Sequence, residues 1–458
     1  MLIIMRGGHM EKLNLEELNV PHKFASSHER AEVVQLISKA AQPFGSIEDA
    51  FLEDLLARIG DARLVLLGES THGTSEFYRM RARITQELIL KKGFNNVALE
   101  ADWPDVEQLN RFVRHLPHGL IEKKIFKRFP SWMWKNEEFH AFVVWLRHYN
   151  SQSSHPQSPV NLYGLDLYNF YQSVETILTY LEQKDPQLAQ TARKQYACFL
   201  SWRNDPSHYG LATAAGLAKG CENEVVSILI KLLESYAENR IPYGEEFVSI
   251  FQNAVSIVDA EEYYRNLYQL QASCWNIRDR HMFQTVETIL SVPRNSAKVI
   301  VWAHNSHVGN AAATDSRKRG EFNLGELCKE KYGDDAYLIG FGTHKGTVAA
   351  ASSWGGQTEI KEVRASHPES VERLFHDSHI PSFFLPLKGE LEQTLKIWLP
   401  QRAIGVIYLP ENELRSHYLH AVLPYQFDEY IWFDHTHAVV PLSIQSKPGA
   451  ADTYPFGI

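Results

Sequence analysis

Short apolar runs alternate along the chain with longer stretches of helical periodicity. The runs have the length and continuity of strands buried on both faces of a parallel sheet, and they occupy residues 63–67, 96–99, 160–163 and 298–302. Between the first two, residues 75–92 repeat apolar positions at helical spacing, and Gly93 follows as a stop signal. A strand, a helix and a second strand in this order predict a parallel pair joined by a right-handed crossover.

Further strands are expected at 336–341, 347–351, 382–385, 404–408 and 430–433, and further helices at 46–59 and 136–149. Residues 173–292 are mostly helical by pattern and contain almost no strand signal. The sequence therefore predicts an α/β fold in which a mostly parallel central sheet is flanked by helices and carries a large inserted helical lobe.

The same pattern predicts how the chain divides. We expect a poorly ordered or cloning-derived leader at 1–20. The first part of an α/β catalytic core is expected at 21–172, the helical lobe at 173–292 and the second part of the core at 293–458.

Composition narrows the class of protein. The chain has 458 residues, of which 44% are hydrophobic and 22% charged, as in globular proteins with a sizeable core. Its net charge is −9 and it has no basic block, so we expect a small-molecule substrate and no nucleic-acid partner. The sequence contains no run of about 18 apolar residues, so we expect no membrane-spanning helix. The pattern does not indicate an oligomeric state.

The number and spacing of the cysteines indicate in which cellular compartment the protein resides. Cys198, Cys221, Cys274 and Cys328 lie far apart and form no C-x-x-C pair. We therefore expect reduced thiols and a cytoplasmic location, with neither a disulfide framework nor a zinc ribbon.

Ionisable residues follow four of the predicted strands at the point where each strand ends. They are Glu69 and His72, Glu100 and Asp102, Asp166, and His304 and His307. Ligands of open α/β sheets bind beyond the carboxyl ends of the strands. Polar residues also mark places where a strand simply leaves the core, but the recurrence of His and Glu indicates one shared site.

Glu69 and His72 stand three residues apart in a glycine-bounded turn before the predicted helix. A helix N-terminus disfavours protonated histidine, and a general base requires a neutral imidazole. The alternative is a turn in which Glu69 only caps its own loop. Arg81 lies beside the apolar stripe of the helix, so it needs a carboxylate partner, which Glu69, Glu100 or Asp102 can supply.

Other chemistries are less well supported. His304 and His307 have H-x-x-H spacing, which leaves a metal site open although the H-E-x-x-H pattern is absent. The turn at 68–73 is not a nucleophile elbow, because that motif requires glycine two residues after the serine, and here His72 follows Ser70 at that distance. This turn also lacks the G-x-G-x-x-G spacing of dinucleotide-binding sites, so we expect no organic cofactor. A bound metal ion remains an alternative.

The ordered set of motifs resembles the erythromycin esterase family, which includes proteins labelled as succinoglycan-biosynthesis-like. The matching stretches are 68–73, Arg81, 99–103, 163–166, 276–279, 302–307 and 433–436. His435 departs from the family pattern, which has an acidic residue at this position. The resemblance implies hydrolysis of a macrolide lactone without a catalytic serine, an activity associated with antibiotic resistance. It also implies the active-site residues, which are His72 as general base with Glu69, Arg81, Glu100, His304 and His307 around it.

We therefore expect an ester hydrolase in which His72 activates a water molecule. Glu69 or Glu100 orients the imidazole, Arg81 orients the carboxylates or draws charge from the ester, and the two later histidines hold the carbonyl oxygen. A cleft between the sheet edge and the helical lobe is expected to admit a bulky ring. The residues expected to contact the substrate are Asp102, Trp103, Asp166, Asn305 and Arg278.

Two alternatives stay open. One is a metal-dependent hydrolase that uses the same His and Glu residues as ligands. The other is a non-enzymatic binding or accessory protein for a polyketide, a sugar or an envelope-polymer intermediate.

Overall fold

A computed structural model describes most of the chain. The described residues are 20–117, 125–152, 159–203, 206–238, 244–268, 271–291 and 297–442. The leader predicted at 1–20 lies outside them, apart from Val20. None of the helices in these parts combines the length and the apolar character needed to cross a membrane.

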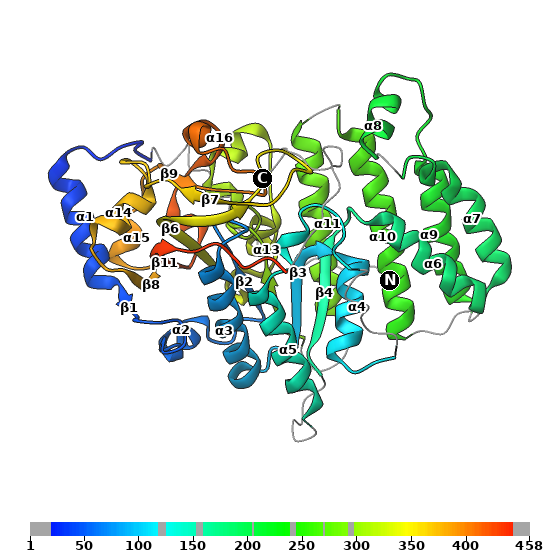
Figure 1. Cartoon of the computed structure of the whole chain (residues 1–458), viewed down its shortest axis with the longest axis horizontal. Coiled ribbons are helices and arrows are strands. Elements are labelled where there is room, and N and C mark those ends of the chain that lie inside the picture. Colours follow the sequence, from blue (N-terminus) through cyan, green and yellow to red (C-terminus); the bar gives the residue numbers. More distant parts are fainter. Residues whose placement is uncertain are drawn as a thin grey trace, which may run out of the picture.

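The centre of the molecule is a nine-stranded mixed sheet (Figure 1). Its strands are β1 Gln42–Pro43, β2 Leu64–Leu67, β3 Asn96–Asp102, β4 Asn161–Asp166, β5 Val299–Trp302, β6 Ala336–Ala350, β7 Glu359–Val363, β8 Ser382–Pro386 and β11 Glu429–Thr436. The order is β1-β8-β11-β6-β2-β5-β3-β4, with β7 paired to the distal part of β6. The six strands from β11 to β4 are parallel, which confirms the predicted α/β fold. A separate two-stranded sheet pairs β9 Leu399–Arg402 with β10 Tyr418–Ala421.

Helices cover both faces of this sheet. The α-helices are α1 Ser27–Ala40, α2 Glu53–Ile59, α3 Ser75–Lys92, α4 Trp103–Val113, α5 Glu137–Ser151, α6 Phe170–Lys184, α7 Pro186–Leu200, α8 Pro206–Ala214, α9 Glu222–Ala237, α10 Glu245–Asn266, α11 Gln271–Ser291, α12 Asn305–Val308, α13 Leu324–Tyr332, α14 Val371–Asp377, α15 Glu390–Thr394, α16 Glu413–Ser416 and α17 Leu423–Gln426. Short 3-10 helices occur at Ser131–Met133, Ala311–Ala313, Asp315–Arg319, Gly333–Asp335 and Pro410–Asn412.

Strand β2 shows why the apolar runs are continuous. Val65 and Leu67 enter the hydrophobic core on one face of the sheet, while Leu64 and Leu66 enter the core on the other. Because successive side chains of a strand point to opposite faces, a strand covered on both sides needs apolar residues throughout.

The helices from α6 to α10 form the end of the molecule opposite α1 (Figure 1). They share a third hydrophobic core with residues of α11, separate from the two that cover the sheet. This agrees with the helical character expected for residues 173–292. The division of the chain into a two-part core and a lobe remains a prediction.

Some elements differ from their predictions. The strands expected at 336–341 and 347–351 are one strand, β6, which changes partners along its length from β2 and β11 to β7. The strand expected at 404–408 is absent, and only isolated bridges form there, at Ile404 and Ile407. The helix expected at 46–59 begins at Glu53. Helices α1 and α4 and strands β1, β7, β9 and β10 had not been predicted.

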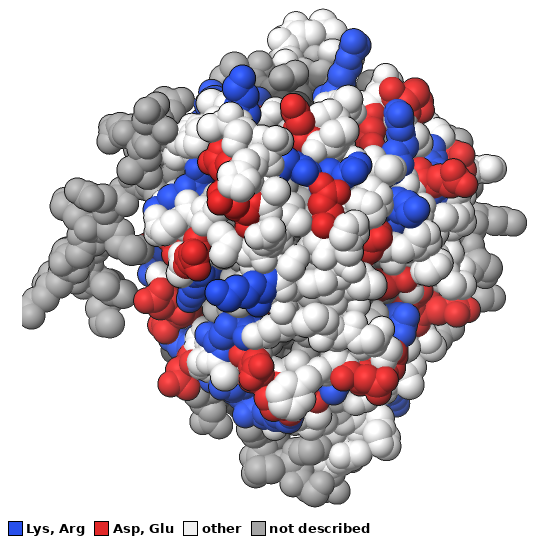
Figure 2. All heavy atoms as spheres, turned by 90° about the vertical axis from the view of Figure 1, so that its left-hand side faces the viewer, with Lys and Arg blue, Asp and Glu red and all other residues white. Residues whose placement is uncertain are grey.

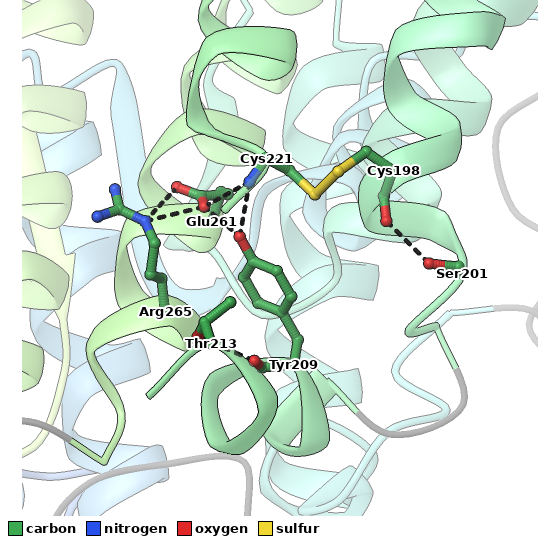
Figure 3. The surroundings of a disulfide bond; sticks show 7 residues. All are labelled: Cys198, Ser201, Tyr209, Thr213, Cys221, Glu261 and Arg265. Atoms are coloured by element: carbon green, nitrogen blue, oxygen red, sulfur yellow. Dashed lines mark hydrogen bonds and ion pairs between the residues drawn. A yellow bond between two sulfur atoms is a disulfide. The ribbon is translucent and has the colours of Figure 1, made fainter. Parts of the chain in front are cut away.

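The expectation of four reduced cysteines is wrong for one pair (Figure 3). Cys198 of α7 and Cys221 at the start of α9 form a disulfide across 23 residues, with their Cα atoms 5.9 Å apart. Packing of α7 against α9 brings the two residues together, which no sequence spacing reveals. Cys274 and Cys328 are free and buried. The cytoplasmic location, which rested on reduced thiols, stays a prediction.

Charges on the face that carries α1 are mixed (Figure 2). Lysine and arginine side chains gather left of the centre of this view, and acidic side chains lie around them. No basic surface extends across this face. The expected absence of a nucleic-acid partner remains a prediction.

Candidate active site

The turn between β2 and α3 places Glu69 and His72 side by side. Oε1 of Glu69 accepts a hydrogen bond of 2.9 Å from Nδ1 of His72. Gly68 makes the turn possible, because a Cβ atom there would lie 2.1 Å from Oδ1 of Asn305. Nδ1 of His72 carries the proton, since a carboxylate only accepts. Nε2 of His72 therefore has a free lone pair, and no residue described in the structure bonds to it.

Arg81 completes this arrangement from the second turn of α3. Its Nη2 lies 2.6 Å from Oε2 of Glu69, and both side chains are fully buried. The guanidinium also lies over the rings of Tyr78 and Trp302, at 4.5 and 4.9 Å from their centroids. Of the three partners proposed for Arg81 from the sequence, the structure selects Glu69.

His304 faces His72 from the end of β5. The two ring centroids are 4.8 Å apart. His304 caps α12, and its Nδ1 accepts a hydrogen bond of 3.2 Å from the backbone N–H of Ser306. Burial holds the pKa of His304 well below its usual value, and a proton on His72 would lower it further. The ring is therefore neutral and carries its proton on Nε2, which is buried near the backbone carbonyl of Ser70.

Glu100 reaches the site through an irregularity in β3. The register between β3 and β4 shifts between Leu99 and Asp102, and such a bulge redirects the side chains within it. Gly164 of β4 leaves room for the shift, because a Cβ atom there would lie 2.6 Å from the backbone of residues 101–103. Oε2 of Glu100 accepts a hydrogen bond of 2.8 Å from the backbone N–H of His304. The bulge thus ties the ends of β3 and β5 together.

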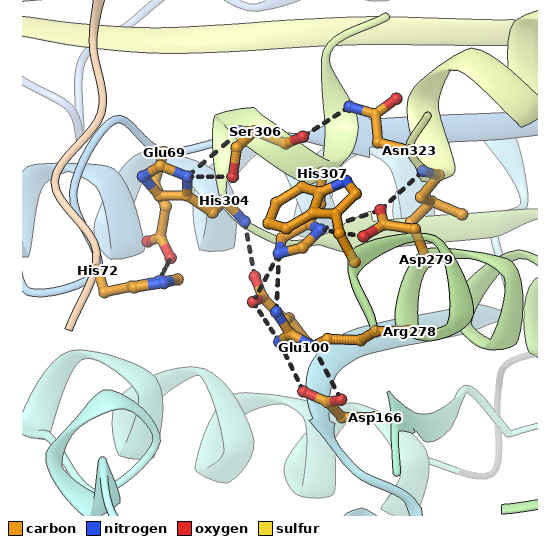
Figure 4. A network of polar contacts seen from close by, with 12 residues as sticks. Glu69, His72, Glu100, Asp166, Arg278, Asp279, His304, Ser306, His307 and Asn323 are labelled. Atoms are coloured by element: carbon orange, nitrogen blue, oxygen red, sulfur yellow. Dashed lines mark hydrogen bonds and ion pairs between the residues drawn. The ribbon is translucent and has the colours of Figure 1, made fainter. Parts of the chain in front are cut away.

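Arg278 of α11 connects the strand ends in a buried network (Figure 4). Its Nη2 lies 2.7 Å from a carboxylate oxygen of Glu100 and 2.7 Å from one of Asp166. Nδ1 of His307 donates to both oxygens of Asp279 at 3.0 Å, and Nε2 of His307 lies 3.3 Å from Glu100. Both ring nitrogens of His307 are therefore occupied.

The charges in this network set each other's protonation. Burial and the charge of Arg278 lower the pKa of His307. The carboxylates of Asp279 and Glu100 have the larger combined effect and raise that pKa to about 9. Burial alone raises the pKa of Glu100, but His307 and Arg278 bring it well below its usual value. Glu100 is therefore a carboxylate. The raised pKa favours a protonated His307, although Nη1 of Arg278 lies 3.0 Å from Nε2 of His307 and opposes a proton there.

A cavity of about 80 Å³ lies beyond these strand ends. Its ionisable lining residues are His72, Glu100, Asp102, Asp105, Arg128, Asp166 and Arg278. Its apolar walls include Phe126, Phe129, Met133, Trp134, Trp354 and Val406. This volume holds several water molecules, whereas pockets that enclose a drug-sized ligand have roughly 300–1,000 Å³. A ring as large as a macrolide therefore needs space outside this cavity.

The residues predicted from the sequence fall into three groups. Those that line the cavity are His72, Glu100, Asp102, Asp166 and Arg278. Those that support them from behind are Glu69, Arg81, His304 and His307. Two of the expected substrate contacts are not among the residues that line the cavity: Trp103 packs on Tyr163, and the side-chain amide of Asn305 bonds to the backbone of Phe341 in β6.

Four residues of the site had been given no role from the sequence, although Asp279 lies in the matching stretch 276–279. Asp105, Arg128 and Tyr168 line the cavity, and Asp279 orients His307. Asp279 stands next to Arg278, so charged residues within a buried helix were a usable signal. Arg128 lies between Phe126 and Phe129 in a segment without helix or strand, so no periodic pattern marks it.

The described residues also bear on the other chemistries. Among them, no group of three or more His, Cys, Asp or Glu side chains is arranged to hold a metal ion. The hydroxyl of Ser70 is buried and has no hydrogen-bond partner within the described structure, so His72 does not activate it.

Comparisons with known proteins agree on one family. The model of the family described as erythromycin esterase matches residues 89–436. A putative hydrolase of Bacillus subtilis, YbfO, is 22% identical over 87% of this chain and 90% of its own. Erythromycin esterase type II of Escherichia coli is 22% identical over 71% of this chain and 81% of its own.

Solved structures show the same fold. A crystal structure titled as a succinoglycan biosynthesis protein has a TM-score of 0.74 at 21% identity, covering 91% of this chain and all of that one. A Bacillus cereus protein has a TM-score of 0.75 at 21% identity, covering 90% and 99%. A histidine-to-asparagine mutant of erythromycin esterase EreC, in its open conformation, has a TM-score of 0.64 at 16% identity, covering 88% and 97%.

Proposed function

The chain belongs to the erythromycin esterase family, and from this premise we propose that it hydrolyses a lactone or related ester with a water molecule activated by His72. The family and the hydrolase named among the relatives support an ester hydrolase. One observation carries the finer proposal: His72 is held at Nδ1 by Glu69 while its ring lines the cavity.

In this mechanism His72 acts as general base. Nε2 takes a proton from water as the oxygen attacks the ester carbonyl. The imidazolium that forms is stabilised by Glu69, whose second oxygen stays paired with Arg81. Because that ion pair is fully buried, the carboxylate of Glu69 is held next to the ring through the cycle.

His304 is the group suited to the developing oxyanion. It is neutral and its ring lies 4.8 Å from that of His72 between centroids, so its Nε2–H can donate to a carbonyl oxygen that reaches past the cavity wall toward it as negative charge builds up. His307 does not line the cavity, so its role in this mechanism is to position other residues. Its contacts with Glu100 and Asp279 fix Glu100, which in turn holds the backbone of His304.

The substrate class is set by the walls of the cavity. They combine aromatic side chains with carboxylates, so they suit a ligand with an apolar body and polar groups. The small volume favours an arrangement in which the ester enters the cavity and a larger ring lies outside it. A macrolide lactone is one such substrate, and a smaller lactone is another.

A panel of macrolides, small lactones and linear esters tests this proposal. Each is incubated with the purified protein and followed by mass spectrometry for a product heavier by one water molecule. Turnover that survives a chelator excludes the metal-dependent alternative. Binding without any product from any ester would contradict the proposal and favour the binding-protein alternative.

A further inference from the structure

Three carboxylic acids stand at the ends of β3 and β4, and one of them is not ion-paired. Glu100 and Asp166 are both held by Arg278 at 2.7 Å. Asp102 accepts one hydrogen bond of 2.8 Å at Oδ1, from the backbone N–H of Asn169. Its other oxygen has no hydrogen-bond or ion-pair partner among the described residues, and the side chain lines the cavity that His72 also lines.

The surroundings of Asp102 favour its protonated form. Asp102 and Asp166 are opposite each other in the β3–β4 register, and Asp105 lies in the first turn of α4. Burial and these two carboxylates together raise the pKa of Asp102 to about 7, against the effect of Arg128. The cavity that His72 lines therefore also holds a carboxyl group that keeps part of its proton near neutral pH.

The proposed hydrolysis needs such an acid. When the tetrahedral intermediate collapses, the leaving oxygen departs as an alkoxide, which is a far stronger base than imidazole. A proton given to that oxygen during bond cleavage lowers the barrier, and general acids contribute about 10²–10⁴-fold to rates.

We propose that Asp102 is a second catalytic residue of this site and protonates the leaving alcohol. His72 takes one proton from water as the new carbon–oxygen bond forms. Asp102 gives one proton to the leaving oxygen as the acyl–oxygen bond breaks. One proton then passes from the imidazolium of His72 to the carboxylate of Asp102 through water, so both groups return to their starting states. This inference rests on the proposed ester hydrolysis.

Two lactones of equal ring size distinguish this role from a structural one. δ-Valerolactone releases an alkoxide, whereas dihydrocoumarin releases a phenolate, which leaves without a proton donor. Asp102→Asn is expected to lower kcat/KM for δ-valerolactone by about 10²-fold and to change that for dihydrocoumarin little. Equal losses on both lactones would overturn the inference while leaving the esterase proposal intact.

Asp105→Asn is the matched control. Asp105 lines the same cavity and also bonds to Asn169, but both its oxygens accept hydrogen bonds, from Phe126 at 3.2 Å and Asn169 at 3.0 Å. Its removal should affect the two lactones alike. Because Asp105 helps to raise the pKa of Asp102, this comparison is made well below pH 7, where Asp102 stays protonated. A selective loss on δ-valerolactone there would count against Asp102 as the donor.

The wild-type protein gives a second test that needs no variant. Its rate on δ-valerolactone should fall above about pH 7, as Asp102 loses its proton, while the rate on dihydrocoumarin should not. The same alkaline fall on both lactones would contradict the inference. If the wild-type protein opens neither lactone but hydrolyses another ester, the same comparison is made between the alkyl and aryl esters of that acid. If the wild-type protein hydrolyses no ester, both proposals are overturned.

Discussion

Glu69 and His72, three residues apart in one turn, are joined by a hydrogen bond of 2.9 Å between Oε1 and Nδ1. The other carboxylate oxygen is 2.6 Å from Arg81. Because Arg81 is buried and lies over the rings of Tyr78 and Trp302, Glu69 cannot turn away from His72 without leaving a buried cation unpaired. The orientation of the histidine is therefore built into the core of the protein.

Glu69→Gln tests the charge on this group. The amide oxygen can still accept from Nδ1 of His72, but it no longer stabilises the imidazolium, so we expect kcat/KM to fall roughly 10²-fold. Loss of the carboxylate beside Arg81 should also lower the unfolding temperature. Glu182→Gln removes an exposed ion pair with Arg193 and serves as control. Full activity in Glu69→Gln would show that the charge of Glu69 plays no part.

Arg278→Gln tests the network that joins the strand ends. It leaves Glu100 and Asp166 buried without their cation, and breaking a buried pair in this way costs about 3–5 kcal/mol. Urea unfolding measures the loss. Arg280→Gln, two residues along α11, removes a half-exposed pair with Glu262 and should cost about 1 kcal/mol or less. Equal losses in the two variants would mean that the network adds nothing to stability.

His307 gives the protein a pH dependence of defined sign. Its pKa is raised to about 9 from an ordinary value of 6.5, so the folded state binds the proton more tightly than the unfolded state. The stability from this group is complete below about pH 6.5 and is lost as the pH rises through about 9. In His307→Gln, the free energy of unfolding should change less across this interval.

The measurement is urea unfolding at both ends of that interval. His420→Gln changes an exposed histidine and should behave like the wild type. A wild-type protein whose stability falls no more than that of His307→Gln would contradict the proposed protonation of His307.

The disulfide predicts which thiols react. After denaturation without a reductant, alkylation should modify Cys274 and Cys328 only, and after reduction all four cysteines. Cys198→Ser with Cys221→Ser should lower the free energy of unfolding by about 3 kcal/mol, because the bond closes a loop of some two dozen residues. Four reactive thiols without a reductant would show that the bond is absent.

Much of the sheet could be predicted from the sequence because its strands are buried on both faces. Four apolar runs became β2, β3, β4 and β5, and the polar residues after them meet at one edge, as parallel strands require. The break expected near Gly346 did not form, since the strand β6 continues there by changing partners. A single sequence does not reveal such an exchange of neighbours.

The site was only partly predictable for a related reason. Glu69 and His72 are neighbours in sequence, so their pairing could be expected. Arg278 reaches Asp166 across 112 residues and Glu100 across 178, and only the packing of α11 on the sheet brings them together. The neutral state of His304 depends on its burial, and the cap that it forms on α12 determines which ring nitrogen carries the proton.

His72→Gln measures the central proposal most directly. The variant and the wild type are incubated with whichever ester the panel identifies, and ester loss is followed by mass spectrometry while circular dichroism confirms the fold. His437→Gln, which changes an exposed histidine, is the control. We predict that the wild type and the control form the product heavier by one water molecule, and that His72→Gln forms almost none. A folded His72→Gln variant that hydrolyses the ester at the wild-type rate would contradict the assignment of His72 as the base.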